Sequence, residues 1–460
     1  MAITFGPITA PMTFSDVEPV FLTDDTLVQR KNALLAGMQR EGFDWLVIYA
    51  DKEHGGNFEY LSGFIPRFEE GLLLLNHSGA CTLVLGNENL KMARTSRTAA
   101  ALLHTPYFSL PNQPMDDEVP LESLFKDAGL ANGHKVGLVG WKMFTPAAGN
   151  GRAMFDLPYF IVDAIQRTLS NDATLENAIH LFIGDNGART TCNANEIAHY
   201  EYGANLASKC MLEALNAIEV GVREKELGAL LHAEGQCNTV VTIAATGNRF
   251  DKANLYPTDK KVQRGDPLSL TTAFKGGLSS RSGFVIADQS ELPPGQQDYL
   301  ERIAKPYFSA VVAWLENIRC GMSGGALYQL IEQVLPKARF GWHLNPGHLV
   351  ADEEWMSSPI YHQSTELLKS GMMLQIDIIP SVSGYNGASA EECVVLADAA
   401  LQSDIRSNYP ALWQRIEIRR HYLRETIGIQ LSDDILPLSN SVAYLRPFFL
   451  AKDQAFSVVS

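Results

Sequence analysis

The chain has 460 residues, of which 46% are hydrophobic, and its formal net charge is −15. This length exceeds what one hydrophobic core usually supports, so we expect two domains. The acidic balance argues against nucleic acids and anionic membranes as partners, because both attract basic surfaces.

The distribution of cysteines and apolar runs bears on the cellular compartment. Six cysteines are scattered without a CxxC pair, which predicts neither a zinc knuckle nor a disulfide framework. No apolar run approaches the ~18 residues of a membrane span. Residues 1–11 lack the basic and apolar regions of a signal peptide. We therefore expect a cytoplasmic protein.

The first 180 residues alternate between helical and strand-like patterns. After an irregular arm, a helical pattern covers 27–39. Short apolar runs that are typical of buried strands follow at 45–49, 71–75, 81–85 and 135–139. This alternation predicts an α/β N-terminal domain. Residues 181–191 are interpreted as a crossover between domains, with 1–185 forming the first domain and 186–460 the second.

The second domain begins with a predicted helix over about 194–218, with Asn193 as its cap and Glu196 in its first turn. A second helix starts after Gly221. Strand-like runs and further helices follow at 240–245, 267–272, 297–319, 324–335 and 409–427. The chain ends in an apolar tail that includes Phe448, which we expect to pack on the domain surface or on a partner.

One histidine and two separated carboxylates lie in apolar, strand-like surroundings near the C-terminal third: His348, Asp377 and Glu391. A carboxylate on a buried strand is costly unless it has a partner, a metal or a proton. A shared polar pocket is the simplest explanation, although a hydrogen-bonded core histidine and structural salt bridges are the ordinary alternatives. By strand alternation, Glu392 is predicted to face the opposite side.

An ordered series of motifs resembles the creatinase/aminopeptidase P/prolidase superfamily, which has the pita-bread fold. The residues that carry the resemblance are Asn195-Glu196-Ile197, 221–227, 242–248, 256–259, 265–267, Gly347-His348, Asp377 and Glu391. The resemblance covers nearly the whole chain. It implies an α/β N-terminal domain and an α+β pita-bread C-terminal domain with a helical tail. It also implies a homodimer in which the N-terminal domain of one chain closes the site of the other.

The resemblance also bears on metal binding. Peptidases of this family hold two metal ions with two aspartates, a histidine and two further acidic residues. The positions of the two aspartates hold Thr271 and Ser282 here, and neither hydroxyl is an anion at neutral pH. His348, Asp377 and Glu391 remain. We therefore expect no cofactor, with one weakly held divalent ion such as Mn or Zn on these three residues as the alternative.

The loss of the first aspartate is similar to creatinase, the metal-free branch of the family. This likeness implies hydrolysis of a C–N bond in a small amide, amidine or guanidino substrate. Asn254 stands where the family has a substrate-side histidine, and Phe284 stands where creatinase has a glutamate. Creatine itself is therefore not implied as the substrate.

Each candidate residue has a predicted role in this reaction. His348, assisted by His343, is predicted to transfer the proton, although His343 is equally consistent with a surface residue. Asp377 and Glu391 are predicted to orient and stabilise cationic nitrogen.

Five further residues are predicted to contact the substrate. Asn254, Thr271, Ser282 and Arg281 would supply hydrogen bonds. Arg67 lies in a segment similar to the one that reaches the partner subunit's site in creatinase. A guanidinium grips a carboxylate bidentately, so Arg67 is a candidate anchor for a substrate carboxylate.

Two other functions stay open at this point. The first is an Xaa-Pro metallo-aminopeptidase or dipeptidase whose ligand set differs from the one aligned here. The second is a catalytically inactive pseudo-peptidase that binds a peptide or small molecule. The serine-containing run 279–283 lacks a G-x-S-x-G elbow, which favours a polar turn or pocket lining over a nucleophile.

Overall fold

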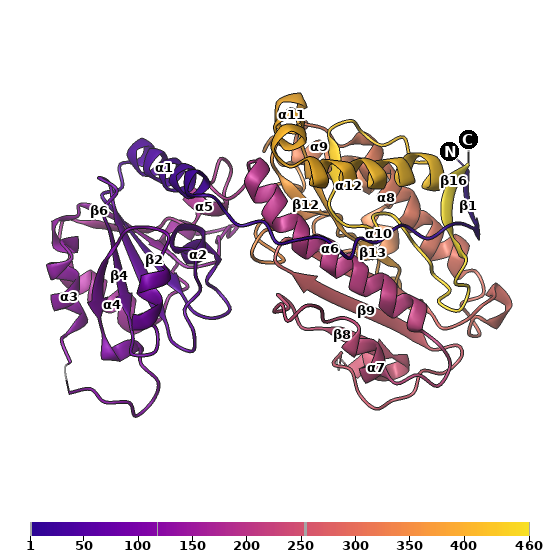
Figure 1. Ribbon diagram of the computed structural model, residues 1–460, viewed down its shortest axis with the longest axis horizontal. Coiled ribbons are helices and arrows are strands. Elements are labelled where there is room, and N and C mark those ends of the chain that lie inside the picture. The colour runs from indigo at the N-terminus through magenta and orange to yellow at the C-terminus, as the bar shows by residue number, and fades with distance from the viewer. Residues whose placement is uncertain (1, 117, 253–254, 460) are drawn as a thin grey trace. The chain divides into compact units, whose positions relative to one another are not determined.

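The computed structural model describes residues 2–116, 118–252 and 255–459, and the chain divides into two compact units (Figure 1). The N-terminal unit comprises Leu22–Thr190, and the C-terminal unit combines Met1–Phe21 with Thr191–Ser460. The observed boundary therefore lies after Thr190 rather than after residue 185. The first 21 residues also belong to the C-terminal unit, because strand β1 (Ala2–Pro7) pairs with the last strand, β16 (Gln454–Val459).

Among the described residues, the N-terminal unit forms a mixed six-stranded sheet in the order β5-β4-β3-β2-β6-β7. Its strands are β2 (Trp45–Ala50), β3 (Gly71–Asn76), β4 (Cys81–Leu85), β5 (Ala101–His104), β6 (Lys135–Val139) and β7 (Thr174–Asn177). Its helices are α1 (Asp24–Glu41), α2 (Gly56–Ser62), α3 (Leu121–Asp127), α4 (Tyr159–Thr168) and α5 (His180–Ile183). Every residue of β2 is buried, as expected for a strand that is covered on both faces. The α/β prediction for this domain is confirmed.

The described part of the C-terminal unit forms two four-stranded sheets, β13-β10-β9-β8 and β11-β12-β14-β15, besides the β1-β16 pair. The strands of the first sheet are β8 (Ile243–Thr246), β9 (Pro267–Phe274), β10 (Gly277–Phe284) and β13 (Ser389–Glu391). Those of the second are β11 (His348–Leu349), β12 (Met373–Gln375), β14 (Cys393–Leu396) and β15 (Ile435–Pro437). The helices are α6 (Ala194–Ala217), α7 (Glu224–Ala229), α8 (Lys305–Asn317), α9 (Gly324–Val334), α10 (Lys337–Phe340), α11 (Ala399–Asn408) and α12 (Pro410–His421). This mixed architecture confirms the predicted α+β C-terminal domain.

Helix α6 begins where the sequence predicted. The Asn193 side chain accepts a hydrogen bond from the Glu196 amide at 3.0 Å, and the Glu196 carboxylate accepts one from the Asn193 amide at 2.8 Å. This reciprocal capping box fixes the start of the helix. From there α6 runs along β9 and β10 (Figure 1), so one face of these strands is covered by helix.

The two faces of β9 and β10 consequently differ in character. Leu268 and Leu270 share a buried hydrophobic cluster with Met211 and Leu215 of α6. Because side chains alternate along a strand, Thr271 on β9 lies on the other face. That other face leads to the candidate site.

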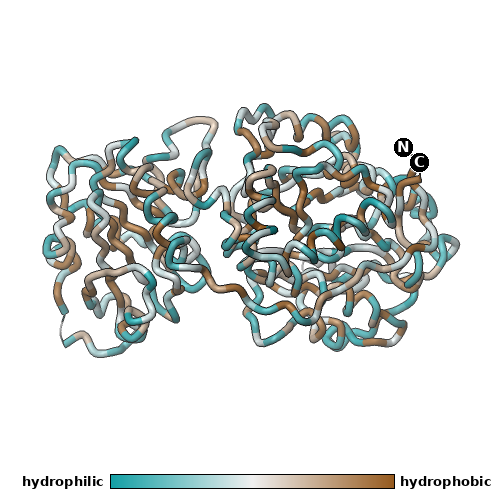
Figure 2. Tube along the Cα trace, turned by 45° about the horizontal axis from the view of Figure 1, so that its top comes forward, coloured by the Kyte–Doolittle hydropathy of each residue, from teal (hydrophilic) through white to brown (hydrophobic). Residues whose placement is uncertain are grey.

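The C-terminal tail is packed, as predicted. Phe448 is buried, and its ring contacts Phe5 of β1 with the ring centroids 5.3 Å apart. Figure 2 shows hydrophobic segments, in brown, gathered inside each unit, while hydrophilic loops lie outside. None of the helices in the described part of the chain combines the length and apolarity that a membrane crossing needs.

Candidate metal centre

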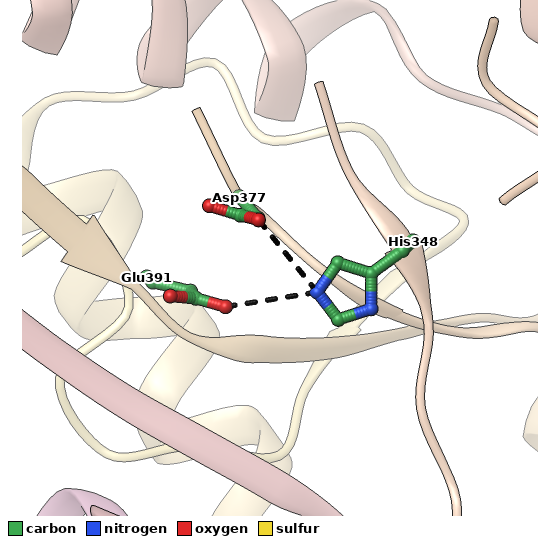
Figure 3. Close-up of side chains that lie close together, drawn as sticks. All are labelled: His348, Asp377 and Glu391. Atoms are coloured by element: carbon green, nitrogen blue, oxygen red, sulfur yellow. Dashed lines mark ion pairs between the residues drawn. The ribbon is translucent and has the colours of Figure 1, made fainter. Parts of the chain in front are cut away.

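Three side chains from three separate strand segments meet in the C-terminal unit. His348 lies on β11, Asp377 follows β12 by two residues, and Glu391 ends β13. The His348 Nε2 atom lies 3.9 Å from Asp377 Oδ2 and 3.7 Å from Glu391 Oε1 (Figure 3). All three side chains are buried, and one ligand atom from each lies within 4.8 Å of the others. The structure therefore brings together the pocket trio that the sequence predicted.

The backbone around these strands fixes their positions. His348 pairs with Gln375 across β11 and β12, and Glu391 pairs with Ser280 across β13 and β10. Gly347 adopts a φ of 122°, and a Cβ there would lie 3.0 Å from the Gln375 carbonyl oxygen. Only glycine suits this position, because the backbone is both left-handed and closely approached. The backbone conformation of Gly347 thus determines how the His348 side chain is placed in the site.

The polar atoms of the three residues are unusually short of partners. Within the described residues, His348 Nε2, Asp377 Oδ1 and Glu391 Oε1 are buried and have no hydrogen-bond partner. A buried polar atom without a partner costs about 1–3 kcal/mol, and more if it is charged. A cation at their meeting point would satisfy all three atoms together.

The electrostatics of the trio indicate a strongly coupled site. Burial raises the pKa of Asp377 to about 6, and burial with the charge of Asp377 raises the pKa of Glu391 well above its usual range. Burial alone would lower the pKa of His348, but the carboxylates of Glu354 and Glu391 outweigh it and raise the pKa to about 10.

Glu354 lies beside His348 and was missed by the sequence reasoning, and Trp355 forms an aromatic wall next to it. Glu354 Oε1 lies 3.2 Å from His348 Nε2, and this contact helps to raise the pKa of His348. The indole of Trp355 stacks on the His348 imidazole, with ring centroids 4.1 Å apart and planes at 21°. An acidic run at 352–354 followed by Trp355 was the available signal, although the sequence alone does not tell which acid turns inward.

The predicted substrate hydroxyls lie on the same sheet face as Glu391. Thr271 pairs with Ser280, which in turn pairs with Glu391, so the three form one row across β9, β10 and β13. The Thr271 hydroxyl donates to Ser280 Oγ at 3.1 Å. Ser282 lies two residues along β10 from Ser280 and therefore shares its face. Neither Thr271 nor Ser282 belongs to the trio itself.

Arg281 is a correction, because the structure places its side chain on the opposite face. Its guanidinium pairs with Glu392 at 2.7 Å and donates to the backbone carbonyls of Ser441 and Tyr444 at 2.8 and 3.1 Å. The side chain is only 1% exposed, so this network occupies a guanidinium that we expected to bind substrate. Arg281 is therefore structural, and the predicted outward turn of Glu392 from the site is confirmed.

The remaining candidates lie apart from the trio or outside the described structure. His343 is exposed in the segment between α10 and β11, and the structure does not group it with the trio. Asn254 lies outside the described residues. Arg67 is exposed in the N-terminal unit, with its guanidinium over the ring of Phe68 at 5.3 Å. Their functional roles stay predictions.

Comparison with known proteins finds a family match over part of the chain. Residues 198–405 match the model of Metallopeptidase family M24. No curated protein sequence matches the chain significantly.

Solved structures with a similar fold include three whose names refer to proline-containing substrates. An Xaa-Pro dipeptidase from Bacillus anthracis aligns with a TM-score of 0.60 at 16% identity, over 81% of this chain and 96% of its own. A prolidase from Pyrococcus horikoshii OT3 aligns with a TM-score of 0.61 at 17% identity, over 80% and 95%. An X-Pro aminopeptidase from Thermotoga maritima MSB8 aligns with a TM-score of 0.60 at 18% identity, over 80% and 95%.

These findings overturn the expectation that no cofactor is needed. The matching family is one of metallopeptidases, and the matched residues contain His348, Asp377 and Glu391. The donors fit an ion, because one imidazole and two carboxylates with free lone pairs form the three-ligand pattern of catalytic metal sites. The prediction rested on the neutral hydroxyls at Thr271 and Ser282, but these residues leave the trio of His348, Asp377 and Glu391 in place. Residues 198–405 thus resemble metallopeptidase family M24, and the chain has the pita-bread fold of the creatinase/aminopeptidase P/prolidase superfamily.

Proposed function

We propose that the C-terminal unit hydrolyses an amide C–N bond of a small substrate at a centre that holds one divalent metal ion. The observation that supports this most directly is the meeting of three buried, unpartnered donor atoms from His348, Asp377 and Glu391. Salt bridges that only stabilise the fold normally satisfy their own hydrogen bonds, as Arg281 and Glu392 do. The trio leaves its lone pairs free instead.

Individual residues of the chain would have separate roles in this reaction. A bound divalent ion would supply Lewis-acid polarisation of a carbonyl group and activation of water. His348 would hold the ion through Nε2, with its ring orientation fixed by the stacked Trp355. Asp377 and Glu391 would each offer a carboxylate oxygen, and the buried setting would exclude bulk water from these contacts.

We infer peptides of the X-Pro type as the first substrate class to test. The support comes from the named activities of similar structures, which are an Xaa-Pro dipeptidase, a prolidase and an X-Pro aminopeptidase. Trp355 adds a local reason, because this residue is 37% exposed and its indole stacks on His348. An apolar aromatic wall next to the metal ligands suits a proline ring.

A second substrate class is a small amidine or guanidino acid cleaved at the same centre. The observation that favours it is the row of hydroxyls on the face of Glu391, including Thr271 and Ser282. Neutral hydroxyls accept hydrogen bonds from a cationic N–H group without demanding a second metal ion. A homodimer and a cytoplasmic location stay predictions.

The test combines metal analysis with a substrate screen. The purified full chain is loaded with Mn²⁺ or Zn²⁺, dialysed, and analysed for bound metal by elemental analysis. X-Pro dipeptides are assayed for released proline, and small amidines and guanidino acids for released ammonia or urea. We expect one ion per chain and turnover that a chelator abolishes.

His348→Ala is the decisive variant, and we expect it to lose both the ion and the turnover. His421→Ala is the matched control, because His421 is an exposed residue at the end of α12. Turnover that persists after complete metal removal would overturn the metal-dependent proposal. A metal-loaded chain that turns over none of these compounds would favour the inactive binding module.

A further inference from the structure

The sheet face that carries Glu391 presents two adjacent rows of side chains across strands β8, β9, β10 and β13. Residues that pair directly across antiparallel strands point to the same face, and so do residues two apart on one strand. The strand registers give a first row of Ile243, Thr271, Ser280 and Glu391 and a second row of Ala245, Ser269, Ser282 and Ser389. Five of these eight side chains carry a hydroxyl group.

This face is reached by solvent, whereas the opposite face of the same strands is not. The four serines of the two rows are all partly exposed, while residues that alternate with them, such as Leu270 and Arg281, are buried. Glu391 ends the first row and is only 7% exposed, and its Oε1 atom has no hydrogen-bond partner among the described residues. A buried carboxylate oxygen without a partner, at the edge of an accessible polar surface, indicates a place for a ligand.

The hydroxyls of this face can offer mainly lone pairs to a ligand. The Ser269 hydroxyl donates to the Arg281 carbonyl at 3.3 Å, and the Ser389 hydroxyl donates to the Ser280 carbonyl at 3.3 Å. In the first row, the Thr271 hydroxyl donates to Ser280 Oγ at 3.1 Å. Because a hydroxyl has a single proton, these three oxygens can only accept further hydrogen bonds. The face therefore favours a ligand that is rich in N–H donors.

The second row lies beside the proposed metal centre and not within it. Ser389 and Glu391 are two residues apart on β13, which corresponds to roughly 7 Å along a strand. Side chains on neighbouring strands have Cβ atoms roughly 5 Å apart, so a planar group with several N–H donors can reach two hydroxyls at once. A group held by this row would be a recognition element of the substrate and would be separate from the bond that is cleaved.

We propose that Ser269, Ser282 and Ser389 form a substrate subsite for an N–H-rich head group, an amidinium or a guanidinium. This inference deepens the proposed function and rests on it, because the same substrate would be hydrolysed at the metal centre. Such a substrate carries its head group roughly 7 Å from the C–N bond that is cleaved.

The experiment compares two small cations as probes of the subsite. Acetamidinium has several N–H donors, whereas tetramethylammonium has the same charge and none. The affinity of each for the full chain is measured by ligand-observed NMR, with Zn²⁺ present to occupy Asp377 and Glu391. We expect acetamidinium to bind at least about tenfold more tightly, which is the scale of hydrogen bonds that involve a charged group.

Variants of the second row locate the binding. Ser269→Ala and Ser389→Ala should each weaken acetamidinium binding by about tenfold, because each removes one acceptor. Ser389→Thr keeps the hydroxyl and should retain most of the affinity. Ser403→Ala, at an exposed position of α11, is the matched control and should bind acetamidinium like the wild type.

The possible failures are distinguishable. Equal binding of the two cations would overturn the preference for N–H donors, and wild-type affinity in both alanine variants of the row would overturn the location. Zn²⁺ binding and X-Pro turnover without acetamidinium binding would overturn only the subsite. A chain that binds acetamidinium through Ser389 but holds no Zn²⁺ would overturn the metal centre instead.

Discussion

Glu391 and Glu392 are adjacent in the sequence, yet their carboxylates face opposite sides of the sheet that ends with β13. Glu391 Oε1 lies 3.7 Å from His348 Nε2 and has no hydrogen-bond partner among the described residues. Glu392 pairs with Arg281 at 2.7 Å and also accepts hydrogen bonds from the hydroxyls of Ser279 at 2.7 Å and Ser441 at 2.5 Å. One glutamate is therefore fully satisfied by the fold, while its neighbour is left available for a ligand.

This division predicts that two conservative variants lose stability to different extents. Glu392→Gln should lower the free energy of unfolding by about 3–5 kcal/mol, because it leaves the Arg281 guanidinium buried without its counter-ion. Glu391→Gln should change the stability of the metal-free chain far less, since it removes a buried carboxyl that has an unsatisfied oxygen. Urea unfolding of both variants in the presence of a chelator measures the difference. Equal losses of stability would contradict the assignment of one glutamate to the fold and the other to the site.

Metal binding should itself stabilise the protein. An ion that binds the folded chain and not the unfolded one contributes about 2.7 kcal/mol when its concentration is 100 times the Kd. We therefore expect added Mn²⁺ to raise the unfolding temperature of the wild-type chain, and a chelator to reverse the rise. Asp377→Asn should abolish most of this effect, whereas Glu392→Gln should keep it. A rise of the same size in Asp377→Asn would show that the ion binds elsewhere.

Much of the fold could be predicted from the sequence, because the relevant signals are local. The capping box of Asn193 and Glu196 and the alternation that turned Glu392 away from Glu391 both act within a few residues. The pocket trio was also predictable, because polar residues in apolar strands need a shared reason to be there. In each case neighbouring residues determine the outcome.

The errors arose where distant segments decide the outcome. Arg281 donates hydrogen bonds to the backbone carbonyls of Ser441 and Tyr444, which lie some 160 residues away in the chain. No residue near Arg281 in the sequence indicates these partners. Glu354 is one of three consecutive acids, and only the anchoring of its turn selects which one meets His348. The N-terminal strand joined the C-terminal unit for the same reason, since its partner β16 is at the other end of the chain.

The stability of the fold against acid should depend on Glu201 of α6. Its two carboxylate oxygens accept hydrogen bonds from Arg415 at 2.9 and 2.7 Å and from Arg419 at 2.7 Å. Burial alone would raise the pKa of Glu201, but the two guanidinium groups outweigh it and hold the pKa below 4.5. A depressed pKa contributes stability that is present above the unfolded-state pKa and is lost as the pH falls through the folded-state pKa.

Glu201→Gln should therefore lower the free energy of unfolding by about 3–5 kcal/mol at neutral pH, because two guanidinium groups lose their buried partner. Its stability should also fall less steeply than that of the wild type as the pH drops below 4.5. Glu213→Gln, an exposed position on the same helix, is the control. Thermal unfolding of the three proteins across acidic pH tests this, and parallel curves for wild type and Glu201→Gln would contradict it.

The hydroxyls at Thr271 and Ser282 should limit the centre to one ion. Both lie on the sheet face of Glu391, at the positions where the family resemblance implies aspartates. The combined Thr271→Asp and Ser282→Asp variant adds two anionic donors beside the existing ones, and bridging carboxylates suit paired hard cations.

We expect the bound Mn²⁺ to rise from one to two ions per chain by elemental analysis. The metal-free variant should be less stable than the wild type, because it crowds buried like charges, and Mn²⁺ should restore the loss. Ser290→Asp, at an exposed turn, should leave the stoichiometry at one. A double variant that still holds a single ion, with its stability unresponsive to Mn²⁺, would show that something other than missing aspartates sets the number of ions.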